Sequence, residues 1–411
     1  MPVPAPARWR HAVDLKQEDD MTPFTFQAPS NILFEAGAAK KIASLAKDYG
    51  ARHVLLVTDK GVRGAGLTRE AEAGLVAAGI ALTVFEDVVA DPPSHVIETA
   101  AELCRSQAID VVVSIGGGSA LDTAKLVAYL ARTPDRLDDI YGVGLAKGAR
   151  LPLILAPTTA GTGSEVTPIS IVTTPTTEKK GVVSPKLIPD WAILDPELTL
   201  GLPPHVTAAT GIDAMVHAIE AYTSRVKKNP MSDQLARKAL ALLAANVRTV
   251  FRDGRNIEAR ADMLLGSMLA GMAFANAPVA AVHALAYPIG AIFHVPHGLS
   301  NALVLPHVLA FNRPAAEPLY AELAELVRPG YRVGSAAEGA SAFIAEMVAI
   351  CRDCEVPASL TAVGIAEADL PKLAEDAMKQ TRLLVNNPRE LAYDQVLAIY
   401  GDALAGRAIA A

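Results

Sequence analysis

An acid and an imidazole lie four residues apart in the apolar stretch "GIDAMVHAIEAY", residues 211–222. If this stretch is a helix, Asp213 and His217 project from the same face, close enough to hold one cation. The same pair is also compatible with a buried hydrogen bond between two side chains and no metal. The spacing of these two residues alone leaves both interpretations open.

Four of the nine histidines lie in a second apolar stretch, "AAVHALAYPIGAIFHVPHGLSNALVLPH", residues 280–307. We expect His283 in a helix, and His297, between Pro296 and Gly298, in a loop that turns its ring inward. Buried polar groups need partners, and one shared metal ion satisfies several of them at once. A carboxylate with imidazoles suits a divalent first-row ion such as Fe(II) or Zn(II), without distinguishing the two.

A glycine-rich segment, "SIGGGSALDTAK" at residues 114–125, joins an expected strand to an expected helix. Gly116, Gly117 and Gly118 allow a ligand to approach the backbone closely. The helix that follows, which we expect Ser119 to cap, offers free N–H groups and a positive dipole end. The segment therefore predicts a phosphate site, with a tight strand-to-helix turn as the alternative.

A second loop of the same form, "PTTAGTGSE" at residues 157–165, supplies the hydroxyls of Thr158, Thr159 and Thr162. Two such loops at the carboxyl ends of adjacent strands suit a pyrophosphate. Asp59 closes the expected strand "RHVLLVTD", where an acid accepts hydrogen bonds from an adenosine ribose and repels a 2′-phosphate. This placement favours NAD over NADP, although an Asp at a strand end is often only a turn former.

The elements around these residues indicate two domains. Expected strands at 52–59, 81–88, 110–119 and from 151 alternate with expected helices at 68–79 and 94–106, a pattern typical of a parallel sheet. Ser94 is the expected N-cap of the second helix. After "LGLPPHVTAATG" helical periodicity dominates. We predict a flexible tail at 1–20, a Rossmann-like α/β dinucleotide-binding domain at 21–204 and a helical metal-binding domain at 205–411, with a ligand cleft between the domains.

Composition excludes several classes of function. The 411 residues are 51% hydrophobic and 20% charged, with a net charge of −7, which gives no basic cluster for nucleic acid. No run of about 18 apolar residues predicts a membrane span. Three cysteines in a chain of this length indicate a reducing cytoplasm. Cys351 and Cys354 form a C-x-x-C at an expected helix end, where we predict no metal or redox role.

The chain resembles the iron-containing (group III) alcohol dehydrogenase family, which includes lactaldehyde reductase and butanol dehydrogenases. The resemblance runs from about residue 25 to about residue 400 and is carried by "GGGSALDTAK", "PTTAGTGSE", "GIDAMVHAIEAY" and "HALAYPIGAIFHVPHG", in the family's order and spacing. It implies an NAD-dependent oxidoreductase in which a metal ion polarises the oxygen of a small alcohol, aldehyde or hydroxy acid. We also expect a homo-oligomer, a dimer or larger.

The resemblance also implies which residues form the site. The metal ligands would be Asp213, His217, His283 and His297. The residues that would hold NAD are Asp59, Gly117, Gly118, Ser119, Asp122, Thr158, Thr159, Thr162, Lys180 and Leu202. Glu220 is interpreted as structural, and His294 and His307 as surface residues or neighbours of the ligands.

One position departs from the family pattern. Many members carry a second histidine one helical turn after the third metal ligand, and this chain has Tyr287 there. A phenol with a reference pKa of about 10 donates a hydrogen bond but transfers protons poorly near neutral pH. Tyr287 is the candidate catalytic residue, and aromatic packing is its alternative role.

The departure keeps other functions open. Hydroxyacid-oxoacid transhydrogenases, which retain their nucleotide, are the first alternative, and a maleylacetate reductase-like enzyme is a more distant one. Glycerol-1-phosphate or dehydroquinate synthase-like relatives would need a basic phosphate-binding set that this sequence lacks. The last alternative is a metal-binding or scaffold protein without enzymatic activity.

Overall fold

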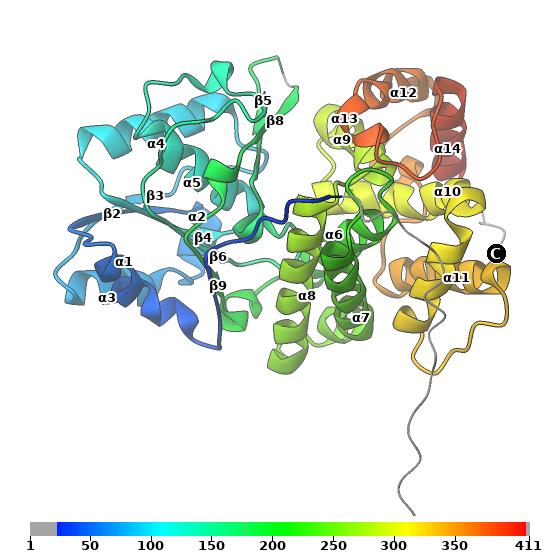
Figure 1. The fold of residues 1–411 in the computed structure, drawn as a ribbon, viewed down its shortest axis with the longest axis horizontal. Helices are drawn as coiled ribbons and strands as arrows, with labels where there is room; N and C mark the ends of the chain where they lie inside the picture. Colours follow the sequence, from blue (N-terminus) through cyan, green and yellow to red (C-terminus); the bar gives the residue numbers. More distant parts are fainter. Residues whose placement is uncertain (1–22, 177, 408–411) are drawn as a thin grey trace, which may run out of the picture.

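The computed structural model describes residues 23–176 and 178–407, so the expected tail at 1–20 lies outside the described residues. In Figure 1 the described chain forms two parts side by side, a sheet covered by helices and a part built from helices alone. This arrangement confirms the expected combination of an N-terminal α/β fold with a C-terminal helical fold.

The main sheet has six parallel strands in the order β1-β9-β6-β4-β2-β3. The strands are β1 (Asn31–Phe34), β2 (His53–Val57), β3 (Ala81–Phe85), β4 (Val111–Gly116), β6 (Leu153–Pro157) and β9 (Trp191–Leu194). Every residue of the central strands β4 and β6 is buried, because helices cover both faces of the sheet. In their register Gly116 pairs with Pro157, so the two loops that follow these strands start side by side.

The helices over the sheet are α1 (Ile42–Asp48), α2 (Lys60–Gly64), α3 (Arg69–Ala77), α4 (Ser94–Ser106) and α5 (Gly118–Leu130). Helices α1 and α3 cover one face, and α4 and α5 cover the other (Figure 1). Alternation along β2 serves both layers, because Val54 and Leu56 pack with the first pair of helices, and Leu55 and Val57 with the second. The glycine loops therefore leave a sheet that is fixed from both sides.

A small second sheet, not expected from the sequence, has the strand order β5-β8-β7. Its strands are β5 (Gly142–Val143), β7 (Ile169–Thr173) and β8 (Lys179–Val183), with β7 and β8 antiparallel and β5 parallel to β8. The single-turn 3-10 helices of the chain are Ala38–Lys41, Leu137–Asp139, Ser164–Val166, Pro185–Leu187, Pro196–Thr199, Leu360–Val363 and Glu367–Asp369.

The helical part follows β9. Its helices are α6 (Pro204–Thr223), α7 (Pro230–Arg252), α8 (Ile257–Asn276), α9 (Ala281–Phe293), α10 (His297–Val327), α11 (Ala336–Asp353), α12 (Leu370–Met378), α13 (Thr381–Leu384) and α14 (Tyr393–Ala405). In the described residues no single helix meets the length and hydropathy of a membrane span, and only α8 and α9 taken together do, with a bend of 105° between them.

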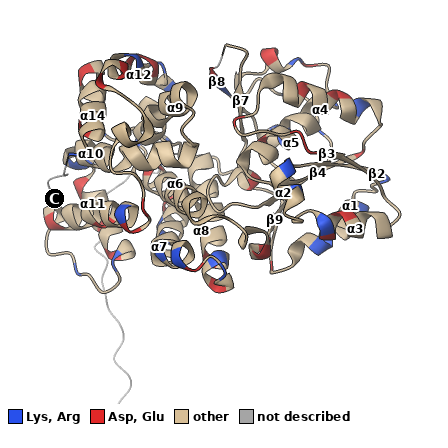
Figure 2. Ribbon diagram, turned by 180° about the vertical axis from the view of Figure 1, so that it is seen from behind, with Lys and Arg blue, Asp and Glu red and all other residues tan. Residues whose placement is uncertain are grey.

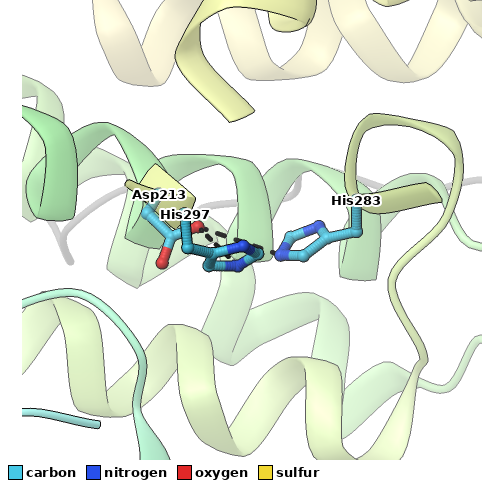
Figure 3. Close-up of side chains that lie close together, drawn as sticks. All are labelled: Asp213, His283 and His297. Carbon is cyan, nitrogen blue, oxygen red and sulfur yellow. Dashed lines mark ion pairs between the residues drawn. The ribbon is translucent and has the colours of Figure 1, made fainter. Parts of the chain in front are cut away.

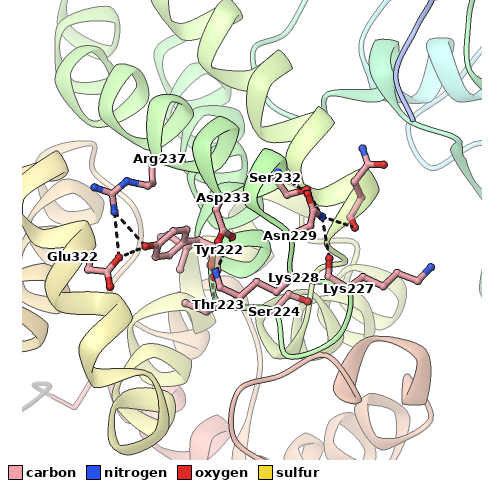
Figure 4. Close-up of polar contacts among 12 residues, drawn as sticks. Tyr222, Thr223, Ser224, Lys227, Lys228, Asn229, Ser232, Asp233, Arg237 and Glu322 are labelled. Atoms are coloured by element: carbon pink, nitrogen blue, oxygen red, sulfur yellow. Dashed lines mark hydrogen bonds and ion pairs between the residues drawn. The ribbon is translucent and has the colours of Figure 1, made fainter. Parts of the chain in front are cut away.

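Helix α6 is the centre of the helical part. Acidic and basic residues mark the outer helices, whereas α6 carries little charge (Figure 2). Its C-terminal end is anchored by Tyr222, whose hydroxyl hydrogen-bonds to Glu322 of α10 and accepts from Arg237 of α7 over 3.2 Å (Figure 4). The amino group of Lys228 lies 4.1 Å from the centre of the Tyr222 ring and 2.7 Å from Asp233. These contacts hold α6 in one position between its neighbours.

Three local expectations were wrong. Ser119 does not cap α5, because the helix already begins at Gly118 and its N-cap is Gly117. Ser94 is likewise the first residue of α4, and Pro93 is the N-cap. His297 does not lie in a loop, because Pro296 takes the N-cap position and His297 opens α10. At the start of all three helices a proline or a glycine, and not a polar side chain, therefore takes the N-cap position.

Candidate metal centre and nucleotide loops

Helix α6 carries Asp213 and His217 one turn apart, both buried at 2% and 4% exposure. The helix starts at Pro204, a residue favoured in the first helical turn because the missing N–H has no intrahelical partner there. Gly211 allows close packing, since a Cβ at this position would lie 2.7 Å from Met263 of α8. The helix therefore brings an acid and an imidazole into the core by tight packing on its neighbours.

His283 of α9 and His297 of α10 complete a cluster with Asp213 (Figure 3). Ligand atoms of these three residues lie within 4.8 Å of one another. Asp213 Oδ1 is 3.9 Å from His283 Nε2 and 3.6 Å from His297 Nε2. Three helices therefore converge on one carboxylate oxygen and two imidazole nitrogens, donors suited to a divalent first-row metal ion.

The ring of His283 tests whether these residues fit a metal ion. Its Nδ1 donates to Glu220 Oε2 over 2.7 Å, which leaves the lone pair of the ring on Nε2. That Nε2 is buried and has no hydrogen-bond partner among the described residues. A buried acceptor without a donor costs free energy, and a cation removes this cost. The residues therefore fit a metal ion.

Glu220 does more than the structural role expected from the sequence. Besides His283, its carboxylate accepts from the backbone N–H of Ala280 over 2.9 Å and of Val282 over 2.7 Å. The carboxylate thus fixes both the start of α9 and the orientation of the His283 ring. Metal-binding histidines usually have such an acceptor on the nitrogen away from the ion. The spacing gave a signal for this role, because Glu220 lies seven residues after Asp213 on the same face of α6.

His217, the fourth expected ligand, lies beside the cluster. Its ring stacks on His283, with 4.7 Å between ring centroids, and on Phe274 at 4.3 Å. Its Nδ1 donates to the carbonyl oxygen of Gly161 over 3.2 Å, so Nε2 carries the lone pair. The contact with Gly161 ties α6 to the second of the two glycine loops.

Burial determines the protonation states in the cluster. It lowers the pKa of His217 to about 3 and that of His297 to about 4, against the opposing effect of the Asp213 charge. Both rings are therefore neutral near neutral pH and offer lone pairs. Burial alone would raise the pKa of Asp213, but the three imidazoles and a hydrogen bond from Asn301 hold it below its usual value.

Asn301 is a neighbour of the cluster that sequence reasoning missed. Its side-chain amide donates to Asp213 Oδ1 over 2.6 Å and lies 3.2 Å from His297 Nε2. Asn301 is fully buried and one helical turn after His297 on α10. The four-residue spacing was the available signal, since it places Asn301 on the same helix face as His297.

The two expected phosphate loops interlock where β4 and β6 end. A Cβ on Gly118 would lie 2.7 Å from Thr162, and a Cβ on Gly116 would lie 2.5 Å from Ala120. A Cβ on Gly117 would lie nearest to the side chain of Thr159. Because its N-cap glycine has no side chain, α5 has no side-chain cap, and its first N–H groups are available to an anion.

The second loop also touches the helical part through glycines. Gly163 has φ +59°, and a Cβ there would lie 2.5 Å from the Cα of Gly271 in α8. A Cβ on Gly161 would lie 2.7 Å from the Cβ of Thr210 in α6. The second loop therefore packs directly on α8 and on α6, the helix that carries Asp213 and His217.

Ser119 and Asp122, both expected to bind the cofactor, line the same cavity as the cluster. Ser119 Oγ accepts from the N–H of Asp91 over 3.2 Å. Asp122 accepts from Ser164 Oγ over 2.6 Å and from the N–H of Ile171 over 2.8 Å. Both side chains thus already connect α5 to neighbouring segments.

The remaining expected cofactor residues lie in several places. Asp59 caps α2, because its Oδ1 accepts from the N–H of Val62 over 2.9 Å. Its Oδ2 lies near the first glycine loop, 4.0 Å from where a Cβ on Gly116 would be. Thr158 follows Pro157, and its N–H donates to Gly116 across the two strand ends over 2.9 Å. Leu202 lies just before α6, where its carbonyl accepts from Arg260 over 3.4 Å.

Lys180 is half exposed, and its amino group lies 5.7 Å from the centre of the Tyr141 ring. The preceding residue, Lys179, is the lysine that lines the cavity, with its amino group 2.8 Å from Asp91. Successive side chains of β8 point to opposite faces, so only Lys179 of the two faces the cavity. Lys180 was expected at the cofactor instead, because the sequence pattern did not predict this sheet.

The cavity has a volume of about 210 Å³ and joins the cluster to the N-terminus of α5. Tyr287 lines it, with 5.8 Å between the centroids of its ring and that of His297. Burial raises the pKa of the Tyr287 phenol above its ordinary value, against an opposing effect of Arg382. The hydroxyl is therefore protonated near neutral pH, as expected from the sequence.

Comparisons with known proteins cover nearly the whole chain. The family model described as "Iron-containing alcohol dehydrogenase" matches residues 29–196, and "Fe-containing alcohol dehydrogenase family, C-terminal" matches residues 207–404. "Long-chain-alcohol dehydrogenase 1" of Geobacillus thermodenitrificans is 41% identical over 373 residues, 90% of this chain and 94% of that protein. "Sulfoacetaldehyde reductase" of Bilophila wadsworthia is 36% identical over 92% of this chain and 98% of that protein.

Solved structures agree with these matches. The crystal structure of a 1,3-propanediol oxidoreductase superposes with a TM-score of 0.90 at 34% identity, covering 93% of this chain and all of that one. An alcohol dehydrogenase from Oenococcus oeni superposes with a TM-score of 0.89, also at 34% identity and 93% coverage of this chain.

Proposed function

This chain belongs to the iron-containing alcohol dehydrogenase family, and on that basis we propose that it interconverts a small alcohol or hydroxy acid with its carbonyl form at the cluster of Asp213, His217, His283 and His297. Family membership makes the protein an oxidoreductase of the alcohol dehydrogenase type that binds a metal ion and NAD(H). We propose Fe(II) as the metal, with Zn(II) as the alternative, and a homo-oligomeric enzyme that works in the cytoplasm.

The single observation that carries this proposal is the buried Nε2 of His283, which has no partner among the described residues and lies 3.9 Å from Asp213 Oδ1. A divalent cation bound there supplies Lewis acidity toward the substrate oxygen, and a bound nicotinamide supplies or accepts the hydride. His217 supports the same role, because its Nδ1–H is already used by Gly161.

The remaining residues bind and orient. The free N–H groups at the start of α5 suit the pyrophosphate of NAD, with Gly117, Gly118, Thr158, Thr159 and Thr162 shaping the approach. Asp59 at the end of β2 suits the adenosine ribose. Phe274, Val279 and Leu383 provide an apolar wall that excludes water. The Tyr287 hydroxyl, held in its protonated form, would donate a hydrogen bond to the reacting oxygen or the ribose.

The test is a panel of alcohols and aldehydes, followed by the absorbance of NADH, with metal content measured on the same protein. We expect turnover that scales with bound metal and that a chelator abolishes. Protein that is fully loaded with Fe(II) or Zn(II), binds NAD and turns over no member of the panel would contradict the proposal.

Tyr287 favours one second candidate, a transhydrogenase that retains its nucleotide and passes hydride between a hydroxy acid and an oxo acid. A protonated phenol in place of a titrating imidazole suits an enzyme that need not exchange protons with solvent in each half-reaction. Purified protein would then carry bound nucleotide, and labelled free NAD would not enter it during turnover. Rapid exchange of free NAD excludes this candidate.

A further inference from the structure

One cation in the cavity has no partner in the part of the chain that the structure describes. The charged side chains that line the cavity are Asp91, Asp122, Lys179, Asp213 and Arg382. Asp91 pairs with Lys179, Asp122 accepts from Ser164 and Ile171, and Asp213 accepts from Asn301 beside the imidazoles. The guanidinium of Arg382 makes no hydrogen bond or ion pair with any described residue.

Arg382 lies on the short helix α13, which is held in a fixed position. The side-chain amide of Asn386 donates to the carbonyl of Arg382 over 3.0 Å and to the carbonyl of Val279, just before α9, over 2.9 Å. The guanidinium lies against the second sheet, because a Cβ on Gly181 of β8 would lie 3.7 Å from Arg382 Nη2. Arg382 thus lies between the helical part and the second sheet, with its backbone anchored beside the cavity.

The surroundings of Arg382 define what the cavity can hold. Its charge acts on Tyr287, where it opposes the rise in the phenol pKa caused by burial. Phe274, Val279 and Leu383 form an apolar surface on the same cavity. The cavity of about 210 Å³ is therefore lined by metal-binding groups, by an apolar wall and by the exposed residue Arg382, whose guanidinium is unpaired among the described residues.

A guanidinium binds planar or multi-oxygen anions through two parallel N–H···O bonds, which gives both affinity and orientation. We propose that the substrate is a short-chain hydroxy acid, or the corresponding aldehyde acid, whose anionic end binds Arg382 while its reacting oxygen faces Asp213, His283 and His297. This inference rests on the proposed function and names the substrate class of the same site. Arg382 is then a specificity-determining residue that touches the substrate away from the reacting carbon.

The experiment compares charged and neutral substrates of equal length on the metal-loaded enzyme with NAD. The probes are 3-hydroxypropanoate, 4-hydroxybutanoate and 5-hydroxypentanoate against 1-propanol, 1-butanol and 1-pentanol. The variants are Arg382→Met, which keeps length and removes charge, and Arg382→Lys, which keeps charge and removes the planar fork. The matched control is Lys379→Met, three residues before Arg382. It removes an exposed cation whose amino group lies 2.7 Å from the carboxylate of Asp376.

We expect the wild-type enzyme to prefer at least one hydroxy acid over its matched alcohol. Arg382→Met should lower kcat/KM for that acid about 10- to 100-fold and change kcat/KM for the alcohol less than about threefold. The kcat/KM of Arg382→Lys for the acid should lie between the values of the wild type and of Arg382→Met. Lys379→Met should have the kcat/KM of the wild type. In a calorimetric titration, the Kd of the hydroxy acid should rise by a similar factor in Arg382→Met.

Three results would overturn the inference. Equal losses for acid and alcohol together with a raised KM for NAD would show that Arg382 holds the nucleotide. An unchanged Kd for the hydroxy acid in Arg382→Met would show that the carboxylate binds the metal ion instead. Unchanged kinetics with every substrate would show that Arg382 stays solvated. In each case the wild-type enzyme still turns over alcohols, whereas failure of the proposed function shows as wild-type protein without any turnover.

Discussion

Glu220 Oε2 and His283 Nδ1 lie 2.7 Å apart in the buried centre of the helical part, which fixes the side of the His283 ring that can face a metal ion. The carboxylate has three donors around it, since Ala280 and Val282 donate to it as well. The same carboxylate thereby orients the His283 ring and holds the N-terminal end of α9, the helix that carries His283.

Replacing Glu220 with Gln should weaken metal binding. The amide has one acceptor oxygen and a donor NH2 group, so it leaves at least one of the three N–H groups without an acceptor. We expect metal affinity to fall about 10- to 100-fold in protein that still folds. Competition with a chelator measures the affinity, and circular dichroism checks the fold. The control is Glu258→Gln, at an exposed position near the start of α8, and equal affinities in both variants would remove Glu220 from the metal site.

Replacing His283 with Ala should remove the metal and the activity together. The variant takes away one of three ligand atoms that lie within 4.8 Å of one another. Metal content by elemental analysis and turnover with NAD are the two readouts. His95→Ala, at an exposed position in α4, is the matched histidine control. Metal and turnover that persist in His283→Ala would show that the ligand set is wrong.

Asp59 should determine the choice between NAD and NADP. Asp59→Ser keeps an oxygen that caps α2 but removes the negative charge, and Asp59→Gly also removes the side chain. Both variants should raise kcat/KM with NADP relative to NAD, because repulsion of the 2′-phosphate is lost. If Asp59 only caps α2, the ratio stays constant in both variants.

Tyr287 should act through its hydroxyl and not through an ionisation. Tyr287→Phe should lower kcat about two- to tenfold without loss of metal, the effect of one hydrogen bond. Tyr287→His should introduce an ionisation near the imidazole reference of about pH 6.5, because burial and Arg382 disfavour the imidazolium while the carboxylates of Asp213, Asp122 and Glu220 favour it. The profile of kcat for alcohol oxidation should then rise with pH through that value. An unaltered kcat in Tyr287→Phe with no new ionisation in Tyr287→His assigns Tyr287 to packing.

Glu165 should make stability depend on pH. Burial raises the pKa of Glu165 to about 7, and Oε1 of this residue has no hydrogen-bond partner among the described residues. In the unfolded chain the pKa is about 4.3, so between these values the folded protein holds the extra proton, and stability falls as the pH rises through this window. The free energy of unfolding of Glu165→Gln, minus that of the wild type, should therefore be about 3 kcal/mol larger at high pH than at low pH.

Urea unfolding of both proteins at about pH 5 and about pH 8 measures this difference, and titrating groups that do not interact with Glu165 cancel in the comparison. A difference between Glu165→Gln and the wild type that is the same at both pH values would show that Glu165 titrates normally in the folded protein.

Strong periodic patterns made most of the fold predictable. The buried strands β2, β4 and β6 and the helices α3 and α4 lie within a few residues of their expected bounds. Each carries a clear apolar pattern, and β4, β6, α3 and α4 also have glycine or proline near one end. The second sheet was missed because β5 has two residues and β8 begins with two lysines. Its pairing depends on contacts between distant segments, which local pattern does not contain.

The site was predictable to a similar degree. Helical spacing placed Asp213 and His217 on one face, but bringing His283 and His297 beside them required the packing of three helices. Asn301 and Lys179 were missed for the same reason, since nothing in their own segments shows what lies opposite them. The roles of all these residues in holding a metal ion or the cofactor stay predictions, as do the domain boundaries at 20 and 204.

The contact between Gly163 and Gly271 sets a limit on how this enzyme can change. The gap between the nucleotide loop and helix α8 contains only hydrogen atoms where side chains would be, since a Cβ on either glycine would lie within 2.8 Å of backbone. Any larger residue there would push the loop away from α8, and with it the nucleotide that we propose the loop binds away from the proposed metal site. Transfer needs the reacting atoms about 3 to 3.5 Å apart, and an error of 1 Å costs about 100-fold in rate. We therefore expect a change of substrate to come from residues of the cavity wall, since the contact between Gly163 and Gly271 leaves no room to change the spacing between the loop and α8.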